Sequence, residues 1–241
     1  MRLLLISNST NAGEEYLGHP KENIREFLGK ERVKALFIPY AGVTISFDDY
    51  EKRVSERFRE IGHEITSIHH SSDPVTAVRE AEAIVVGGGN TWQLLRMTQD
   101  NGLIDHVREK VLSGTPYIGW SAGANMACPT IKTTNDMAIT EPGSFEAFGL
   151  VPFQINPHYL DSNPEGHAGE TREQRINEFT VVNRGIYVVG LREGTMLIAE
   201  GGKMRLAGPK NARLFFGSSR PVEAGSGDDL SFLLREEQWR V

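Results

Sequence analysis

Five short segments in the first half of the chain are mostly apolar, and they constrain its fold more than any other feature. They cover residues 3–6, 35–38, 65–68, 84–86 and 117–120. A strand whose two faces are both covered by helices is continuously apolar, whereas a half-exposed strand alternates polar and apolar residues. The segments therefore predict the buried strands of a mostly parallel sheet.

Helical patterns separate these segments. In the clearest one, apolar residues recur at intervals of three and four and form a single stripe: Phe47, Tyr50, Val54, Phe58 and Ile61. Ser46 with Asp49 resembles a capping box, and Gly62 ends the helix. Two further helices are expected to begin directly after the capping residues Asp73 and Asn90.

Alternation of strands and helices favours an α/β fold with a doubly wound, mostly parallel sheet, in which ligands bind beyond the carboxyl ends of the strands. The second half differs. After a helix over residues 172–182, opened by Thr171, strand patterns follow closely at 186–190, 196–199, 204–206 and 214–216. Such close spacing predicts antiparallel hairpins that extend the sheet. No linker interrupts the chain, so we expect one catalytic domain over residues 1–241.

Charge and composition exclude several classes of protein. Lys and Arg number 26 against 32 Asp and Glu, a net charge of −6, and no basic run is dense enough to bind nucleic acid. The apolar start at residues 3–6 is too short for a membrane span or a signal peptide, which indicates a cytoplasmic protein. Cys128 is the single cysteine, so an internal disulfide is impossible, and we expect a small buried side chain.

A serine follows the fifth apolar segment in the sequence Gly119-Trp120-Ser121-Ala122-Gly123. A serine on a strand-to-helix turn has strained backbone geometry and an exposed hydroxyl, and the flanking glycines avoid collisions that a Cβ would cause. This context favours Ser121 as a nucleophile over an ordinary glycine-rich turn.

A nucleophilic serine needs a base and a third group that orients the base. His158 is our candidate base because a proline stiffens its approach in Gln154-Ile155-Asn156-Pro157-His158. His167 is the competitor, in a glycine-rich loop. Two acids could orient His158. Glu193 follows the apolar run 186–191, and it would lie at the same sheet edge as Ser121 if that run is parallel to the core strands. Asp136 lies in a polar segment.

The glycines at 87–89 follow the fourth apolar segment. Gly88 and Gly89 could donate backbone N–H groups to an oxyanion together with Ala122. A phosphate-binding role is weaker, because neither nucleotide-binding glycine motif is present. Asn90 caps the next helix and is also a candidate substrate-binding residue. Arg172 lies at a helix start, where the helix dipole disfavours a cation, so it is a candidate for binding a substrate carboxylate.

Metal-binding motifs are missing from the sequence. It contains no H-E-x-x-H, no Cys/His cluster and no Asp-rich calcium loop. We therefore expect no metal and no cofactor.

Several stretches resemble the peptidase E family of bacterial aspartyl dipeptidases. They are Leu5-Ile6-Ser7-Asn8-Ser9-Thr10, Ile38-Pro39-Tyr40-Ala41-Gly42-Val43-Thr44, Val86-Gly87-Gly88-Gly89-Asn90-Thr91, Gly119-Trp120-Ser121-Ala122-Gly123-Ala124-Asn125, Thr133-Thr134-Asn135-Asp136-Met137, Gln154-Ile155-Asn156-Pro157-His158 and residues 166–176. The resemblance implies a flavodoxin-like fold similar to class I glutamine amidotransferases. It also implies a metal-independent serine peptidase that removes N-terminal aspartate from Asp-X dipeptides.

Carried onto this sequence, the resemblance implies Ser121 as nucleophile, His158 as base and Arg172 as the residue that grips the aspartyl side chain. It leaves the third member open between Asp136 and Glu193. We favour Glu193, which leaves Asp136 to bind the substrate α-ammonium. The expected partner is a small Asp-X dipeptide, and the protein is expected to be a monomer or homodimer. The alternatives are a cyanophycinase-like or other acyl hydrolase of the same fold, and a binding module without catalysis.

Overall fold

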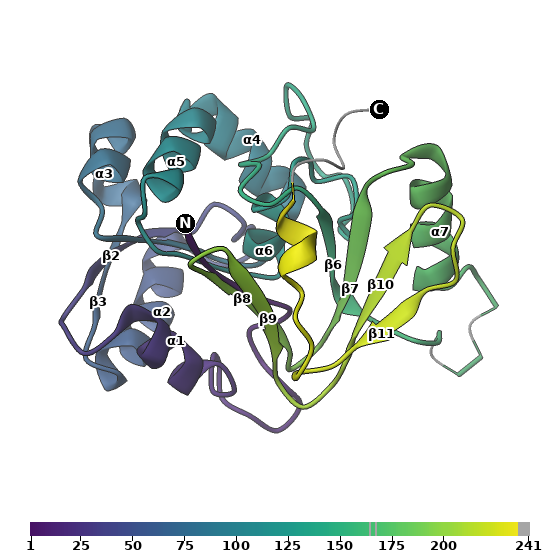
Figure 1. Cartoon of the computed structure of the whole chain (residues 1–241). Helices are drawn as coiled ribbons and strands as arrows, with labels where there is room; N and C mark the ends of the chain where they lie inside the picture. The colour runs from purple at the N-terminus through teal and green to yellow at the C-terminus, as the bar shows by residue number, and fades with distance from the viewer. Residues whose placement is uncertain (164, 167, 236–241) are drawn as a thin grey trace.

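The computed structural model describes residues 1–163, 165–166 and 168–235, and it contains two β-sheets (Figure 1). The larger sheet has seven strands: β1 (Arg2–Ile6), β2 (Lys34–Ile38), β3 (Glu64–Ser67), β4 (Ala83–Val86), β5 (Tyr117–Trp120), β8 (Met196–Glu200) and β9 (Lys203–Ala207). Their order in the sheet is β3-β2-β4-β5-β1-β8-β9. The strands β1 to β5 are mutually parallel, β8 pairs antiparallel with β1, and β9 pairs antiparallel with β8.

The five apolar segments are thus confirmed as five parallel strands. The third strand ends at Ser67, one residue before the predicted end, because Ile68 begins a 3-10 helix, η1 (Ile68–His70). The other helices are α1 (Lys21–Leu28), α2 (Phe47–Glu60), α3 (Pro74–Glu80), α4 (Thr91–Asp100), α5 (Leu103–Leu112), α6 (Ala122–Met126), α7 (Arg172–Val182) and the 3-10 helix η2 (Ser231–Leu234).

Helices cover both faces of the larger sheet, which explains its apolar strands. In β1, Leu4 and Ile6 pack with residues of α1 and α2, whereas Leu3 and Leu5 pack with residues of α3, α4 and α5. Figure 1 shows α1 and α2 on one side of the sheet and α3, α4 and α5 on the other. All four leucine and isoleucine side chains are fully buried. The doubly wound architecture follows from this two-sided burial.

Helix starts follow the predicted caps. The side chains of Ser46, Asp73 and Asn90 each accept a hydrogen bond from a backbone N–H in the first turn of α2, α3 and α4. Thr171 and Gln174 form a complete capping box at the start of α7. These caps satisfy backbone donors that a helix cannot pair internally.

A second, smaller sheet corrects one prediction. It contains β6 (Gln154–Tyr159), β7 (Tyr187–Arg192), β10 (Ala212–Phe216) and β11 (Val222–Ala224), in the order β11-β10-β7-β6. The prediction that the late strands all extend the first sheet is therefore wrong for β7 and β10. The reason is β6, whose polar residues conceal a strand that pairs in parallel with β7. Only the hairpin β8–β9 extends the larger sheet.

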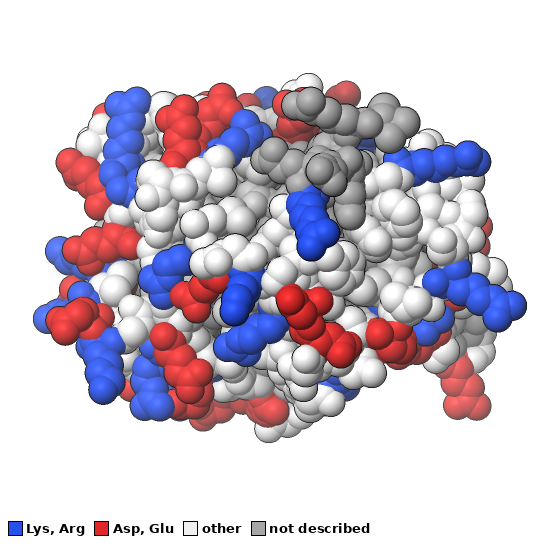
Figure 2. Space-filling view, viewed as in Figure 1, with Lys and Arg blue, Asp and Glu red and all other residues white. Residues whose placement is uncertain are grey.

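One face of the molecule carries mixed charge, and the single cysteine is buried. Figure 2 shows acidic and basic side chains interspersed over one face, whose centre is mostly uncharged. Cys128 is fully buried, as expected, and burial raises the pKa of its thiol. In the described ranges, no helix combines the length and the hydropathy needed to cross a membrane.

Candidate active site

Ser121 occupies a strained turn between β5 and α6. Its backbone has φ 53° and ψ −112°, a region that residues with a Cβ rarely adopt. The two flanking glycines make the turn possible. A Cβ on Gly119 would lie 2.4 Å from the carbonyl oxygen of Gly123, and one on Gly123 would lie 2.2 Å from that of Val86. The turn is held by the Ser121 N–H, which donates to the carbonyl of Ile6 at 3.0 Å.

His158 lies on β6 at an irregularity of the strand. The pairing register with β7 shifts between Pro157 and Tyr159, and His158 has φ 52°. Its backbone N–H donates to Ser7 Oγ at 3.0 Å, and the Ser7 hydroxyl donates to the carbonyl of Leu191 at 2.7 Å. The bulge thus turns the imidazole out of the strand toward the larger sheet.

Ser121, His158 and Glu193 form a continuous hydrogen-bonded chain. His158 Nε2 lies 2.9 Å from Ser121 Oγ, and His158 Nδ1 lies 2.7 Å from Glu193 Oε1. The His158 and Glu193 side chains are 40% and 45% exposed, so these three hydrogen-bonded residues are accessible to solvent. An imidazole in these contacts can take the serine proton at one nitrogen while a carboxylate fixes the other.

The strand that places Glu193 beside His158 belongs to a different sheet from the one that the sequence predicted. The run that precedes it forms β7 in the smaller sheet, parallel to β6, and not a strand of the core sheet. The turn that contains Glu193 connects β7 to β8 and therefore links the two sheets. Gly194, at φ 84°, donates its N–H to Asn8 Oδ1 at 2.8 Å, which anchors this turn to the segment after β1.

Asp136 is bonded to the start of α4 instead of to His158. Its Oδ2 accepts hydrogen bonds from Thr91 N–H at 2.8 Å, Thr91 Oγ1 at 2.5 Å and Thr134 Oγ1 at 3.2 Å. All three bonds fall on one oxygen, and the side chain also lines the cavity that contains Ser121. The second carboxylate oxygen, Oδ1, is therefore available for a cationic group in that cavity.

The glycine segment lies directly against the serine. A Cβ on Gly88 would lie 3.0 Å from Ser121 Cβ, and one on Gly89, at φ 134°, would lie 2.2 Å from the Ala41 carbonyl oxygen. The hydroxyl of Tyr50 donates to the Gly88 carbonyl at 2.8 Å. Burial raises the pKa of Tyr50, which keeps this donor protonated. The carbonyl of Gly88 is thus held in place beside the serine.

Two other predicted residues lie at the starts of helices. Ala122 is the first residue of α6, so its N–H has no acceptor within the helix. Asn90 caps α4 through its side-chain oxygen, and its side-chain nitrogen donates to the Met137 carbonyl at 2.9 Å. Asn90 lines the cavity, but both ends of its amide are already occupied by protein groups.

The cavity around Ser121 has a volume of about 570 Å³. Its wall includes six of the candidates, Gly88, Gly89, Asn90, Ser121, Asp136 and His158. It also includes a set that sequence reasoning missed: Ser9, Tyr16, residues 41–45, Tyr50, Arg53, Trp120 and Ile139. Arg53 stacks over Tyr16, with its guanidinium carbon 4.7 Å from the ring centroid. In the sequence it belongs to the polar face of a helix, which is why no pattern identified it. It is the one Lys or Arg among the described residues of this wall.

Arg172 lies beside this cavity, not in its wall. It lines a hollow of about 230 Å³, and Asp136 lines both spaces. Its guanidinium donates to Asn135 Oδ1, and in the part of the chain that the structure describes it has no carboxylate ion pair. Burial lowers the pKa of Arg172, and the charge of Asp136 opposes this effect. A partly desolvated guanidinium without a carboxylate partner is suited to binding an anion.

His167, the competing base, lies outside the described residues. Potential metal ligands gather at one place in the described chain, at Asp48, Glu51, His69 and His70, and none of the four lines the cavity of Ser121.

Comparisons with known proteins agree with this architecture. The model of peptidase family S51 matches residues 3–207. A protein named peptidase E from Nostoc sp. (strain PCC 7120) is 52% identical over 97% of this chain and 96% of its own length. Peptidase E from Citrobacter koseri is 47% identical over 93% of this chain and 99% of its own.

Solved structures give the same fold at lower identity. A peptidase from an acI-B1 actinobacterium has a TM-score of 0.70 at 18% identity, and each chain is covered to 96%. A structure from Listeria monocytogenes EGD-e has a TM-score of 0.65 at 22% identity, with 87% of this chain and 98% of that chain covered.

Proposed function

The chain belongs to peptidase family S51 and is a serine-type peptidase, and we propose that it hydrolyses Asp-X dipeptides with a free N-terminal aspartate. The observation that carries the proposal is the chain of contacts from Ser121 through His158 to Glu193. Relatives of about 50% identity over nearly the whole chain are named peptidase E, so a cyanophycinase-like activity is not favoured.

Ser121 is the nucleophile in this proposal. His158 Nε2 removes the proton from Ser121 Oγ as the oxygen attacks the peptide carbonyl, and Glu193 stabilises the imidazolium that forms. The tetrahedral intermediate collapses, the C–N bond breaks, and His158 donates its proton to the departing amine. Water, deprotonated by His158, then hydrolyses the aspartyl ester on Ser121 and releases aspartate.

The oxyanion of the intermediate is held by backbone N–H groups of Ala122 and of the glycine segment at Gly88 or Gly89. Two observations support this role. Ala122 begins a helix, where N–H groups lack internal acceptors, and the Gly88 backbone lies against Ser121. Donors fixed before the reaction stabilise developing charge without reorganisation.

Aspartyl recognition is assigned to two charged residues, Asp136 in the wall of the serine's cavity and Arg172 beside that cavity. Asp136 Oδ1 pairs with the substrate α-ammonium, since Oδ2 is already occupied by Thr91 and Thr134. Arg172 pairs with the aspartyl β-carboxylate through a guanidinium that lacks a protein carboxylate among the described residues. Opposite charges on the two sides of the aspartyl residue match its ammonium and carboxylate. Asn90 forms part of the wall of the cavity that contains Ser121.

Arg53 supplies a reason for a dipeptide substrate. It lies in the wall of the same cavity, which also includes residues 41–45 and Tyr16. In a dipeptide the second residue ends in a carboxylate, whereas in a longer peptide that position is a neutral amide. We assign Arg53 to this terminal carboxylate.

The proposal also covers the domain organisation, the oligomeric state and the location of the protein. The protein acts as one domain over residues 1–241, as a monomer or homodimer, without nucleic acid or a cofactor in the reaction. A cytoplasmic location suits its single, buried cysteine, since reducing compartments do not depend on disulfides.

Steady-state hydrolysis of five compounds tests the function: Asp-Leu, Glu-Leu, Asn-Leu, Ala-Leu and N-acetyl-Asp-Leu, each with EDTA present. We expect turnover of Asp-Leu alone, because the other four lack the β-carboxylate, displace it or block the ammonium. Ser121→Ala, checked for fold by circular dichroism, should lose on the order of 10⁴-fold or more in kcat. No turnover by folded protein, together with turnover of an aspartyl-arginine polymer, would instead support the cyanophycinase-like alternative.

A further inference from the structure

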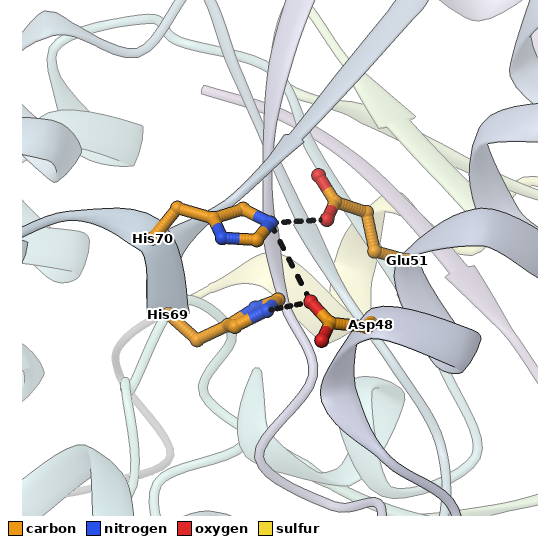
Figure 3. Close-up of side chains that lie close together, drawn as sticks. All are labelled: Asp48, Glu51, His69 and His70. Atoms are coloured by element: carbon orange, nitrogen blue, oxygen red, sulfur yellow. Dashed lines mark hydrogen bonds and ion pairs between the residues drawn. The ribbon is translucent and has the colours of Figure 1, made fainter.

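Four side chains with metal-binding atoms converge between the start of α2 and η1. Figure 3 shows Asp48 and Glu51 pointing from α2 toward His69 and His70. One ligand atom from each residue lies within 4.8 Å of the other three. His69 Nε2 is 2.9 Å and His70 Nε2 is 3.9 Å from Asp48 Oδ1, and His70 Nε2 is 2.6 Å from Glu51 Oε2.

A buried serine orients two members of this cluster. Ser67 is 1% exposed, its Oγ lies 2.6 Å from His69 Nδ1, and its N–H donates to Glu51 Oε1 at 2.8 Å. The Ser67 hydroxyl also lies 3.5 Å from the Phe37 carbonyl. Its contact with Nδ1 leaves the other ring nitrogen of His69, Nε2, directed at Asp48 Oδ1. Outer partners of this kind fix the ring and the tautomer of histidines that bind metals.

The cluster contains two carboxylates and no fixed cation among the described residues. Neither Asp48 nor Glu51 forms an ion pair with a Lys or Arg within these ranges. Two carboxylates and two imidazoles in contact can hold a positive charge in two ways, as protons on the imidazoles or as one metal ion bound by the four side chains.

We propose that Asp48, Glu51, His69 and His70 form a binding site for a divalent transition metal, with Zn²⁺ as the best fit. Zinc bonds of about 2.0–2.1 Å to nitrogen and oxygen in a tetrahedron separate the ligand atoms by roughly 3.3 Å. The observed separations of 2.6, 2.9 and 3.9 Å bracket this value. Ca²⁺ and Mg²⁺ prefer oxygen ligands in larger number, whereas two imidazoles favour zinc-like ions.

The site is structural. Four protein ligands complete a tetrahedron and leave no open position for a substrate or water. In the sheet, β3 is three strands from β5, which places the turn after β3 about 14 Å along the edge from Ser121. The ion would fasten the first turn of α2 to η1. That helix also carries Tyr50, whose hydroxyl bonds the Gly88 carbonyl.

No sequence motif marks this site, because its ligands come in two pairs from separate segments. Neither pair has the spacing of a known metal motif, and only the packing of α2 against β3 and η1 joins them. The proposed metal site shares no residue with the wall of the catalytic cavity, so its test is independent of the proposed function.

Metal binding is measured on full-length protein without a histidine tag, after treatment with a chelator. Calorimetric titration with ZnCl₂ should give one ion per chain, and CoCl₂ should give the intense visible absorption of tetrahedral Co²⁺. His70→Ala and Asp48→Asn alter side chains that are 52% and 79% exposed, so the fold is retained. Each should weaken Zn²⁺ binding by roughly 10- to 100-fold. Glu56→Gln on α2 and His106→Ala on α5 are the controls and should bind as the wild type does.

A thermal melt gives a second readout. Zinc at about 100 times Kd should raise the Tm of the wild type by about 5–10 °C and that of the two variants much less. The proposal is overturned if the wild type binds no zinc up to about 100 μM. It is also overturned if the variants bind zinc as tightly as the wild type, because the ion would then lie elsewhere.

Discussion

The hydroxyl of Ser7, directly after the first strand, accepts the backbone N–H of His158 at 3.0 Å, although 151 positions separate the two residues. The same hydroxyl donates to the carbonyl of Leu191 near the end of β7. One fully buried serine thus joins the larger sheet to the neighbouring strands β6 and β7 of the smaller sheet, and it does so at the candidate base. The distance between nucleophile and base depends on this junction.

Ser7→Ala should therefore lower kcat about tenfold while leaving KM and the pH profile unchanged, because His158 keeps its chemistry but loses a positional restraint. The loss of buried hydrogen bonds should also cost about 1–2 kcal/mol of unfolding free energy. Ser67→Ala removes another buried serine, far from the cavity, and is the control. It should lose similar stability with no change in kcat for Asp-Leu. An unchanged kcat in Ser7→Ala would contradict the positioning role.

The two acids should respond differently to neutralisation. Glu193→Gln should lower kcat by on the order of 10³–10⁴ with little change in KM, because the imidazolium loses its carboxylate. Asp136→Asn should mainly raise KM, by about 10- to 100-fold, because its carboxylate is assigned to the substrate ammonium. Initial rates measured over a range of Asp-Leu concentrations give kcat and KM separately. Equal losses of kcat with KM untouched in both variants would refute this division.

Two arginines should govern different ends of the substrate. Arg172→Gln should lower kcat/KM for Asp-Leu by about 100-fold, because the β-carboxylate loses its cationic partner, and should therefore remove most of the selectivity for aspartate. Arg53→Gln should remove the preference for Asp-Leu over its C-terminal amide. Arg59→Gln, at an exposed position of α2 that lines neither hollow, is the control and should change neither ratio. If Arg53→Gln reduced selectivity for aspartate and Arg172→Gln did not, the assignments would be reversed.

The turn at Ser121 has no room for a side chain at Gly123. Gly123→Ala would place a Cβ 2.2 Å from the Val86 carbonyl oxygen, and both atoms belong to rigid elements. We expect a loss of about 3 kcal/mol in unfolding free energy from this overlap. Gly227→Ala, where a Cβ meets nothing within 4 Å, should be close to neutral. Urea denaturation of both proteins measures the difference, and equal midpoints would contradict the packing argument.

The smaller sheet should weaken in acid. Hydrogen bonds from Arg192 lower the pKa of Asp161 and of Glu223. A carboxyl group with a depressed folded-state pKa stabilises the fold above its ordinary pKa, 4.5 for Glu223, and this contribution is lost as the pH falls through the lower folded-state value.

Glu223→Gln should accordingly cost on the order of 1 kcal/mol at pH 7, after allowance for solvent screening, and progressively less below about pH 4. Unfolding in urea at pH 7, 5 and 3 measures this trend. Glu56→Gln, exposed on α2, serves as the control. A deficit that stays constant down to pH 3 would show that the ion pair is not its cause.

Local sequence patterns account for much of the larger sheet. Continuous apolar segments predict its five parallel strands, and the side chains of Ser46, Asp73, Asn90 and Thr171 predict four helix starts. Both signals are local, because burial on two faces selects apolar residues and a cap acts within one helical turn. For the same reason the glycines around Ser121 mark the strained turn.

Only the tertiary structure decided how the second half pairs and which side chains meet. It placed β7 beside β6 in a separate sheet, brought His158 to Glu193 and assigned Asp136 to Thr91 and Thr134. It also put Arg53 in the cavity wall and joined Asp48 and Glu51 to the two histidines after β3. These relationships depend on strand register, a bulge and helix packing between distant segments. Amino-acid sequence by itself determined the elements of this protein, and their packing determined its sites.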